Sequence, residues 1–161
     1  MATSSARAGD AVTTLARGEK GRRTPALERI APGIALSRGR YLEARGWLLG
    51  EVHNGIALAK VHGTTGRGLS ALAMECGGFD TGLFREQLRL IAEDPSIKAL
   101  VIDFDTPGGM ANGNMAVCQD IRAVSAAGKR VYGYASLMCC SAGYFIAAAC
   151  DEFHAHPDAI V

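Results

Sequence analysis

Three consecutive residues, Cys139, Cys140 and Ser141, are candidate nucleophiles. A thiol or hydroxyl becomes an effective nucleophile when its pKa is lowered or when a base lies within hydrogen-bonding reach. Residues 141–150 form a small-residue apolar segment that predicts a helix, so Ser141 is expected at its N-cap or in its first turn. Free N–H groups there would stabilise developing negative charge, which favours Ser141 or Cys140 as nucleophile. The alternative is a serine that only caps the helix.

A second stretch that could take part in catalysis is DTPGG, residues 105–109. Pro107 fixes φ, and the pair Gly108 and Gly109 permits backbone conformations that other residues avoid. A glycine pair after a buried strand can direct a backbone N–H at a ligand oxygen, as an oxyanion hole requires. The alternative is an ordinary turn between a strand and a helix.

Apolar periodicity predicts the elements that position these two loops. The predicted strands are residues 54–63, 97–104, 129–136 and 152–157; the predicted helices are 80–94, 112–128 and 141–150; residues 64–78 are predicted to be a loop. This alternation indicates an α/β fold of repeated βαβ units with right-handed crossovers and a mainly parallel sheet. Because ligands bind beyond the carboxyl ends of such strands, both loops are expected at one edge of the sheet.

Charge divides the chain of 161 residues into two parts. Residues 1–46 carry nine Lys or Arg against four Asp or Glu, whereas residues 47–161 carry eight against twelve. We interpret 1–46 as a basic, partly disordered leader and 47–161 as the globular domain. No apolar stretch is long enough for a signal peptide or a membrane span, so a cytoplasmic location is expected. The five cysteines have no CxxC spacing, and neither a metal nor a cofactor is expected.

The order strand–DTPGG–helix–strand–CSAG–helix resembles the serine peptidases of the signal peptide peptidase A type, within the broader Clp-protease/crotonase-like fold of repeated ββα and βαβ units. The resemblance covers about residues 52–161. The variant DTPGGM, together with the serine loop MCCSAG, looks most like the bacteriophage branch, the capsid-assembly or head-maturation proteases. The membrane-anchored branch usually opens with a transmembrane helix, which this sequence lacks.

The resemblance implies a role for each matching residue. Ser141 would be the nucleophile, and the backbone N–H groups of Gly109 and Ala142 would form the oxyanion hole, with Gly108 shaping the turn. Thr106 stands where many relatives carry serine. The cysteines match no catalytic position, so we interpret Cys140 as packing behind the nucleophile and Cys139 as a loop residue.

The resemblance also implies partners. The substrates would be phage scaffold and portal proteins cleaved in the prohead, bound as an extended strand beside the glycine loop. We expect the chain to associate into a homo-oligomer. We expect neither a membrane nor a nucleic acid as a partner.

The general base is the point at which this sequence departs from the family. There it is a lysine several dozen residues beyond the serine, past a Gly-Ser-Ile-Gly-Val segment, and this chain ends at Val161 where that segment would begin. The four lysines match no such position: Lys20, Lys60, Lys98 and Lys129. His62, at the end of the first predicted strand, is a weak candidate substitute. We therefore expect a peptidase fold that is incomplete at its C-terminus and, without its base, inactive.

Two alternatives stay open on the sequence. One is a non-catalytic scaffold or interaction remnant of a prophage protease. The other is a crotonase-like enzyme acting on acyl-CoA, which uses similar pairs of backbone N–H groups but has no need of a loop serine. The segment CSAG at the start of a helix argues against the second alternative.

Overall fold

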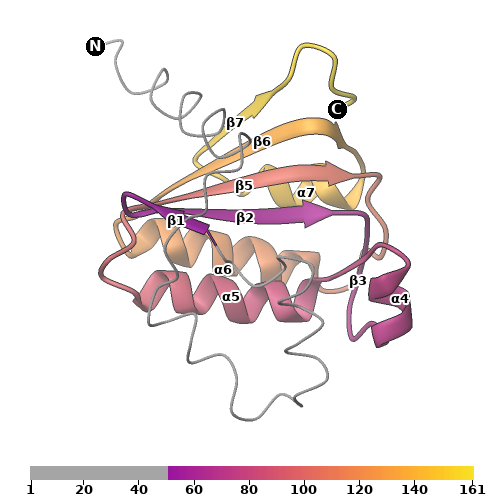
Figure 1. Ribbon diagram of the computed structural model, residues 1–161, viewed down its shortest axis with the longest axis horizontal. Helices are drawn as coiled ribbons and strands as arrows, with labels where there is room; N and C mark the ends of the chain where they lie inside the picture. Colours follow the sequence, from indigo (N-terminus) through magenta and orange to yellow (C-terminus); the bar gives the residue numbers. More distant parts are fainter. Residues whose placement is uncertain (1–50) are drawn as a thin grey trace.

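The computed structural model describes residues 51–161, in which strands and helices alternate along the chain (Figure 1). The main sheet contains β1 (Glu51–His53), β2 (Ile56–His62), β5 (Ala99–Thr106), β6 (Arg130–Cys139) and β7 (Glu152–Ala155) in the order β1-β2-β5-β6-β7. The first pairing is antiparallel and the other three are parallel. The predicted α/β fold with a mainly parallel sheet is confirmed. The predicted leader, residues 1–46, lies outside the described residues.

One face of the sheet is covered by the helices α5 (Thr81–Glu93), α6 (Asn114–Ala126) and α7 (Ala142–Ala147). Their apolar stripes share one hydrophobic core with alternate residues of the strands. Each large side chain buried there contributes about 1.5–3 kcal/mol relative to an exposed one. The main helical contributors to this core are Phe84, Leu88, Ile91, Val117, Ile121, Val124 and Ile146. Within residues 51–161, none of the helices is long and apolar enough to span a bilayer.

Local sequence signals set the ends of the two long helices. The Asp80 carboxylate caps α5 by accepting hydrogen bonds from the N–H groups of Gly82 and Leu83. Gly128 follows the end of α6 with a φ of +84°, the left-handed conformation that glycine adopts readily after a helix. The predictions of helices over 80–94 and 112–128 are confirmed.

The prediction of a loop over residues 64–78 is wrong. This stretch contains β3 (Thr64–Gly66) and α4 (Ala71–Glu75) and leads into β4 (Gly78–Asp80), which pairs with β3 as a second, two-stranded parallel sheet. Elements of three to five residues are too short to display a hydrophobic period, so the sequence pattern does not reveal them.

Two further boundaries differ from the prediction. The strand β6 continues to Cys139, beyond the predicted end at Ser136, because it resumes pairing with β5 at Thr106 after a register shift. The helix α7 ends at Ala147 and is therefore shorter than the predicted segment 141–150.

A buried cation joins the end of α5 to the start of β6. The Lys129 ammonium donates hydrogen bonds to the carbonyl oxygens of Ile91 and Asp94, in the last turn and at the C-cap of the helix. Carbonyl groups at the end of a helix have no N–H donor in the next turn. The lysine supplies a donor to both, and the Asp94 carbonyl also accepts the N–H of Ile97 at 3.2 Å. Burial lowers the pKa of Lys129, and the nearby charge of Asp94 opposes that shift.

We expect Lys129→Met to destabilise the fold by about 1–3 kcal/mol, because it removes the donor to the Ile91 carbonyl and one of the two donors to the Asp94 carbonyl. Lys98→Met is the matched control, since Lys98 is exposed just before β5, and it should change stability by no more than about 0.5 kcal/mol. Urea unfolding followed by circular dichroism measures both. Equal midpoints for the two variants would contradict the structural role of Lys129.

Candidate active site

The loops after β5 and β6 meet at the edge of the sheet where the parallel strands end (Figure 1). An ideal Cβ built on Gly108 would lie 2.7 Å from the Cβ of Ser141 and 2.8 Å from the carbonyl oxygen of Cys140. Only a glycine permits this approach, and the φ of +96° at Gly108 also favours one. The structure therefore brings the predicted glycine turn and the predicted nucleophile into direct contact.

Ser141 adopts an unusual backbone conformation for a residue with a side chain. Its φ is 51° and its ψ is −119°, and its side chain makes no capping hydrogen bond to α7. Ser141 therefore occupies the N-cap position of α7, as predicted, but its side chain does not cap the helix. Such a conformation costs about 1–3 kcal/mol and persists only where the surroundings impose it, which is common at functional sites. Ser141 is also exposed, so its hydroxyl is accessible.

Two backbone N–H groups at this edge are free to bind an anion. The N–H of Thr65 donates to the carbonyl oxygen of Gly108 at 2.8 Å, and the N–H of Met110 donates to the carbonyl oxygen of Thr65 at 2.8 Å. These bonds occupy one edge of the glycine loop and leave the Gly109 N–H on the other. Within residues 51–161, neither the Gly109 N–H nor the Ala142 N–H donates a hydrogen bond. They are the two donors that the resemblance implies.

Thr65, which no sequence motif identifies, pairs with the glycine loop. It forms a parallel bridge with Gly109, and an ideal Cβ on Gly109 would lie 2.3 Å from the Thr65 carbonyl oxygen. A side chain at position 109 would therefore push the loop away from β3. The strand β3 has three residues and gives no periodic signal, so the sequence offered no way to find this support.

No candidate base in residues 51–161 forms a hydrogen bond with Ser141. The Nε2 atom of His62 lies 2.9 Å from Oδ2 of Asp103, so the ring is held by a carboxylate on β5. Lys98 and Lys129 precede β5 and β6 and lie at the edge opposite the glycine loop. Lys60 is exposed within β2.

The thiols next to Ser141 differ from each other in their surroundings. Cys139 is fully buried at the end of β6, so its interpretation as a loop residue is wrong. Burial raises its pKa to about 12, and burial likewise raises the pKa of Cys150 to about 12. Both thiols are protonated at neutral pH and therefore poor nucleophiles. Cys140 is half-buried, and its Sγ lies 3.8 Å from the carbonyl oxygen of Ile160.

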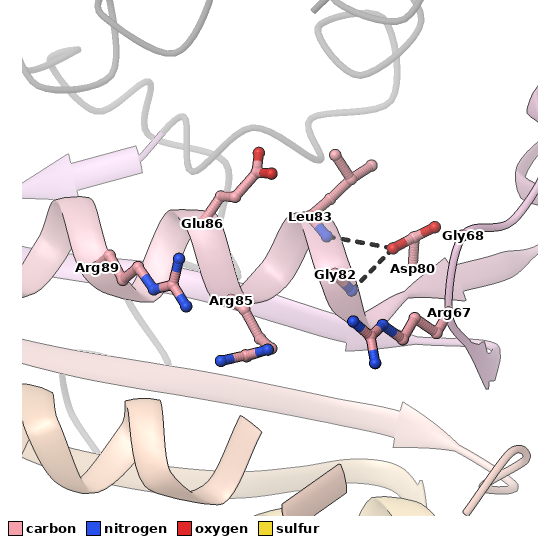
Figure 2. A pocket seen from close by; sticks show the side chains of 8 residues that line it. All are labelled: Arg67, Gly68, Asp80, Gly82, Leu83, Arg85, Glu86 and Arg89. Carbon is pink, nitrogen blue, oxygen red and sulfur yellow. Dashed lines mark hydrogen bonds between the residues drawn. The ribbon is translucent and has the colours of Figure 1, made fainter. Parts of the chain in front are cut away.

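A cavity of about 300 Å³ lies along the first turns of α5, and Ser141 is not among the residues that line it (Figure 2). Two of its charged groups are already engaged: Asp80 accepts the helix N–H groups drawn as dashed lines, and Arg85 donates to Asp120 at 2.5 Å. The residues that line the cavity are Arg67, Gly68, Asp80, Gly82, Leu83, Arg85, Glu86 and Arg89. None of them is a serine, cysteine or histidine. The cavity therefore offers no nucleophile of its own.

Comparison with known proteins finds one clear relative. The chain is 37% identical over 102 residues to the capsid assembly protease C of Escherichia phage lambda, which corresponds to 63% of this chain and 23% of that protein. The chain thus spans less than a quarter of the length of this relative. No protein-family model matches the chain.

Among solved structures, the similarities are weaker. An enoyl-CoA hydratase/isomerase family member has a TM-score of 0.42 and 17% identity, covering 65% of this chain and 45% of that one. A protein assigned as an enoyl-CoA hydratase, from Mycobacterium avium paratuberculosis K-10, has a TM-score of 0.37 and 14% identity, covering 73% and 46%. Both scores are low, so the fold description rests on the sheet topology.

We expect Gly108→Ala to destabilise the fold more than Gly128→Ala does. Both glycines have a positive φ, but a Cβ on Gly128 would meet nothing within 4 Å, whereas one on Gly108 would overlap Ser141. The control variant Gly128→Ala should lower the free energy of unfolding by about 1–2 kcal/mol, because alanine is unfavourable at a positive φ. In Gly108→Ala, overlap with Ser141 should lower it by about 1–3 kcal/mol more. Urea unfolding measures the difference. Equal losses would show that the two loops are not in tight contact.

We expect exposed and buried cysteines to react at different rates with iodoacetamide in mildly alkaline buffer. Cys76 is exposed and should react quickly, whereas Cys139 and Cys150 should stay unmodified because their raised pKa values keep them protonated and burial shields them. Raising the pH toward 12 should increase their reactivity, as should unfolding in urea. Mass spectrometry of peptides gives the extent at each cysteine. Rapid modification of Cys139 in the folded protein would contradict its placement in β6.

Proposed function

We propose that this chain carries the nucleophile and the oxyanion hole of a serine endopeptidase. The observation that supports it best is the strained and uncapped Ser141 lying against a glycine turn that presents the free N–H of Gly109. The Ala142 N–H supplies the second donor. Two N–H groups aimed at a developing oxyanion stabilise the transition state of acyl transfer, and removing one such donor typically slows catalysis by about 100- to 1000-fold.

The chemistry follows from these groups. The Ser141 Oγ attacks the carbonyl carbon of the scissile peptide bond, its proton passes to a general base, and the carbonyl oxygen becomes an oxyanion held by the two N–H groups. Collapse of the tetrahedral intermediate expels the amine, which takes up the proton, and leaves an ester on Ser141. Water then hydrolyses the ester by the same route.

The proton acceptor is assigned to no residue in 51–161, since none contacts the serine through a hydrogen bond. The resemblance to the signal peptide peptidase A type implies a lysine amine in this role. We infer that the acceptor comes from outside the described residues, and that residues 51–161 without it hydrolyse substrate slowly or not at all.

The free edge of the glycine loop suggests how substrate binds. The loop pairs with Thr65 on one edge only, so the N–H and C=O of Gly109 can pair with an extended peptide on the other. Addition of a strand gives affinity through main-chain hydrogen bonds. The 37% identity to a capsid assembly protease supports phage capsid proteins as the substrate class. Cleavage of scaffold or portal proteins, a prohead location and self-association stay predictions.

A fluorophosphonate probe tests the proposal, because Ser141 can attack its phosphorus and displace fluoride while the phosphoryl oxygen occupies the oxyanion hole. Alkaline buffer supplies the proton acceptor that the described residues lack. We expect peptide mass spectrometry to find the label on Ser141. The variant Ser141→Ala should lose the label, and Cys140→Ala, which removes the neighbouring thiol, should keep it.

A folded protein that takes up no label from neutral to alkaline pH would contradict catalysis by this chain. That outcome would favour a non-catalytic interaction protein. Retention on immobilised coenzyme A together with absence of labelling would instead favour an acyl-CoA enzyme.

A further inference from the structure

One buried side chain, Thr106, joins the three segments that build the candidate active site. Its Oγ1 donates a hydrogen bond to the carbonyl oxygen of Gly63 at 2.6 Å and accepts one from the N–H of Gly108 at 3.0 Å. Its own carbonyl oxygen accepts the N–H of Cys140 at 3.0 Å. Thr106 is fully buried at the end of β5, so water does not compete for these bonds.

The hydroxyl decides which N–H groups of the glycine turn are free. Because Oγ1 accepts the Gly108 N–H, that donor points inward and is satisfied. The next N–H, on Gly109, is then left as the free donor at the edge of the loop. Without Oγ1, the Gly108 N–H and the Gly63 carbonyl would both lack a partner, and the turn would have to rotate to satisfy them.

The methyl group of Thr106 has a separate role. An ideal Cβ on Gly143 would lie 2.3 Å from Cγ2 of Thr106, so the methyl fills the space beside the first turn of α7. The hydroxyl thus orients the glycine turn, and the methyl contacts the helix that follows the nucleophile. These two contributions can be separated by substitution, because serine keeps only the hydroxyl and valine keeps only the branched shape.

We propose that Thr106 is a positioning residue for the oxyanion turn: its hydroxyl holds Gly108 so that the Gly109 N–H faces the carbonyl that Ser141 attacks. This inference rests on the proposed function, and it concerns a residue that does not touch substrate.

The test compares Thr106→Val and Thr106→Ser in the full chain. We expect Thr106→Val to slow fluorophosphonate labelling of Ser141 by about tenfold or more, since small displacements of a transition-state donor are costly. Thr106→Ser should stay within about threefold of the wild-type rate, since it keeps the hydroxyl that makes both hydrogen bonds.

Thr81→Val is the matched control. Thr81 is also buried, and its hydroxyl donates to the carbonyl oxygen of Gly66 at 2.9 Å, at the end of β3. This variant should also lower the unfolding temperature, by less than Thr106→Val because it loses one buried hydrogen bond instead of two. It should leave the labelling rate unchanged. Equal slowing by both variants would show a loss of stability only and would overturn the proposal.

Amide hydrogen exchange, measured by NMR, separates failure of this inference from failure of the proposed function. We expect the Gly108 amide to exchange faster in Thr106→Val and to stay protected in Thr106→Ser and Thr81→Val. If the wild-type protein takes up no label, the proposed function fails, and the exchange pattern alone decides whether Thr106 holds the turn. Unchanged protection of Gly108 in Thr106→Val overturns the positioning role. If Thr106→Val does not fold, a Thr106→Ser variant that labels more than tenfold slower than wild type also overturns it.

Discussion

The approach of Gly108 to Ser141 is the contact on which the candidate active site depends. A side chain at position 108 would overlap the serine and the peptide group that precedes it. Two contacts hold the glycine turn in this position: the Thr106 hydroxyl accepts the Gly108 N–H, and Thr65 forms a parallel bridge with Gly109. The position of Ser141 relative to the free N–H groups therefore depends on close packing of the backbone.

The strain at Ser141 is balanced by ordinary stabilising interactions around it. The Cys140 N–H is bonded to the end of β5, and α7 packs Ile146 and Ala147 into the common core. Core burial of this kind contributes several kcal/mol, more than the cost of about 1–3 kcal/mol for one residue in an unfavourable conformation. A serine held in this way presents its hydroxyl to solvent beside two unpaired N–H groups. Such an arrangement suits covalent catalysis better than a structural cap, for which the side chain would turn toward the helix.

The chain is similar to a phage capsid assembly protease, with 37% identity over 102 residues. The matched region is a small part of that protein, so it supports the kind of chemistry without fixing the substrate. The structure is consistent with this: in the described residues an exposed serine lies beside two free backbone N–H groups, and no basic side chain forms a hydrogen bond with that serine.

The sequence alone determined the alternation of strands and helices, because apolar residues repeat with clear periods from Ile56 to Val124. It also predicted that the glycine turn and the loop at Ser141 lie at the same edge of the sheet, since the carboxyl ends of parallel strands lie together. The tertiary structure decided three features that the hydrophobic repeat of the sequence does not reveal. They are the short strand β3, the continuation of β6 to Cys139, and the absence of a capping hydrogen bond from the Ser141 side chain. Those features depend on contacts between segments far apart in the chain, such as Thr65 with Gly109 and Thr106 with Gly63, and only folding brings these residues together.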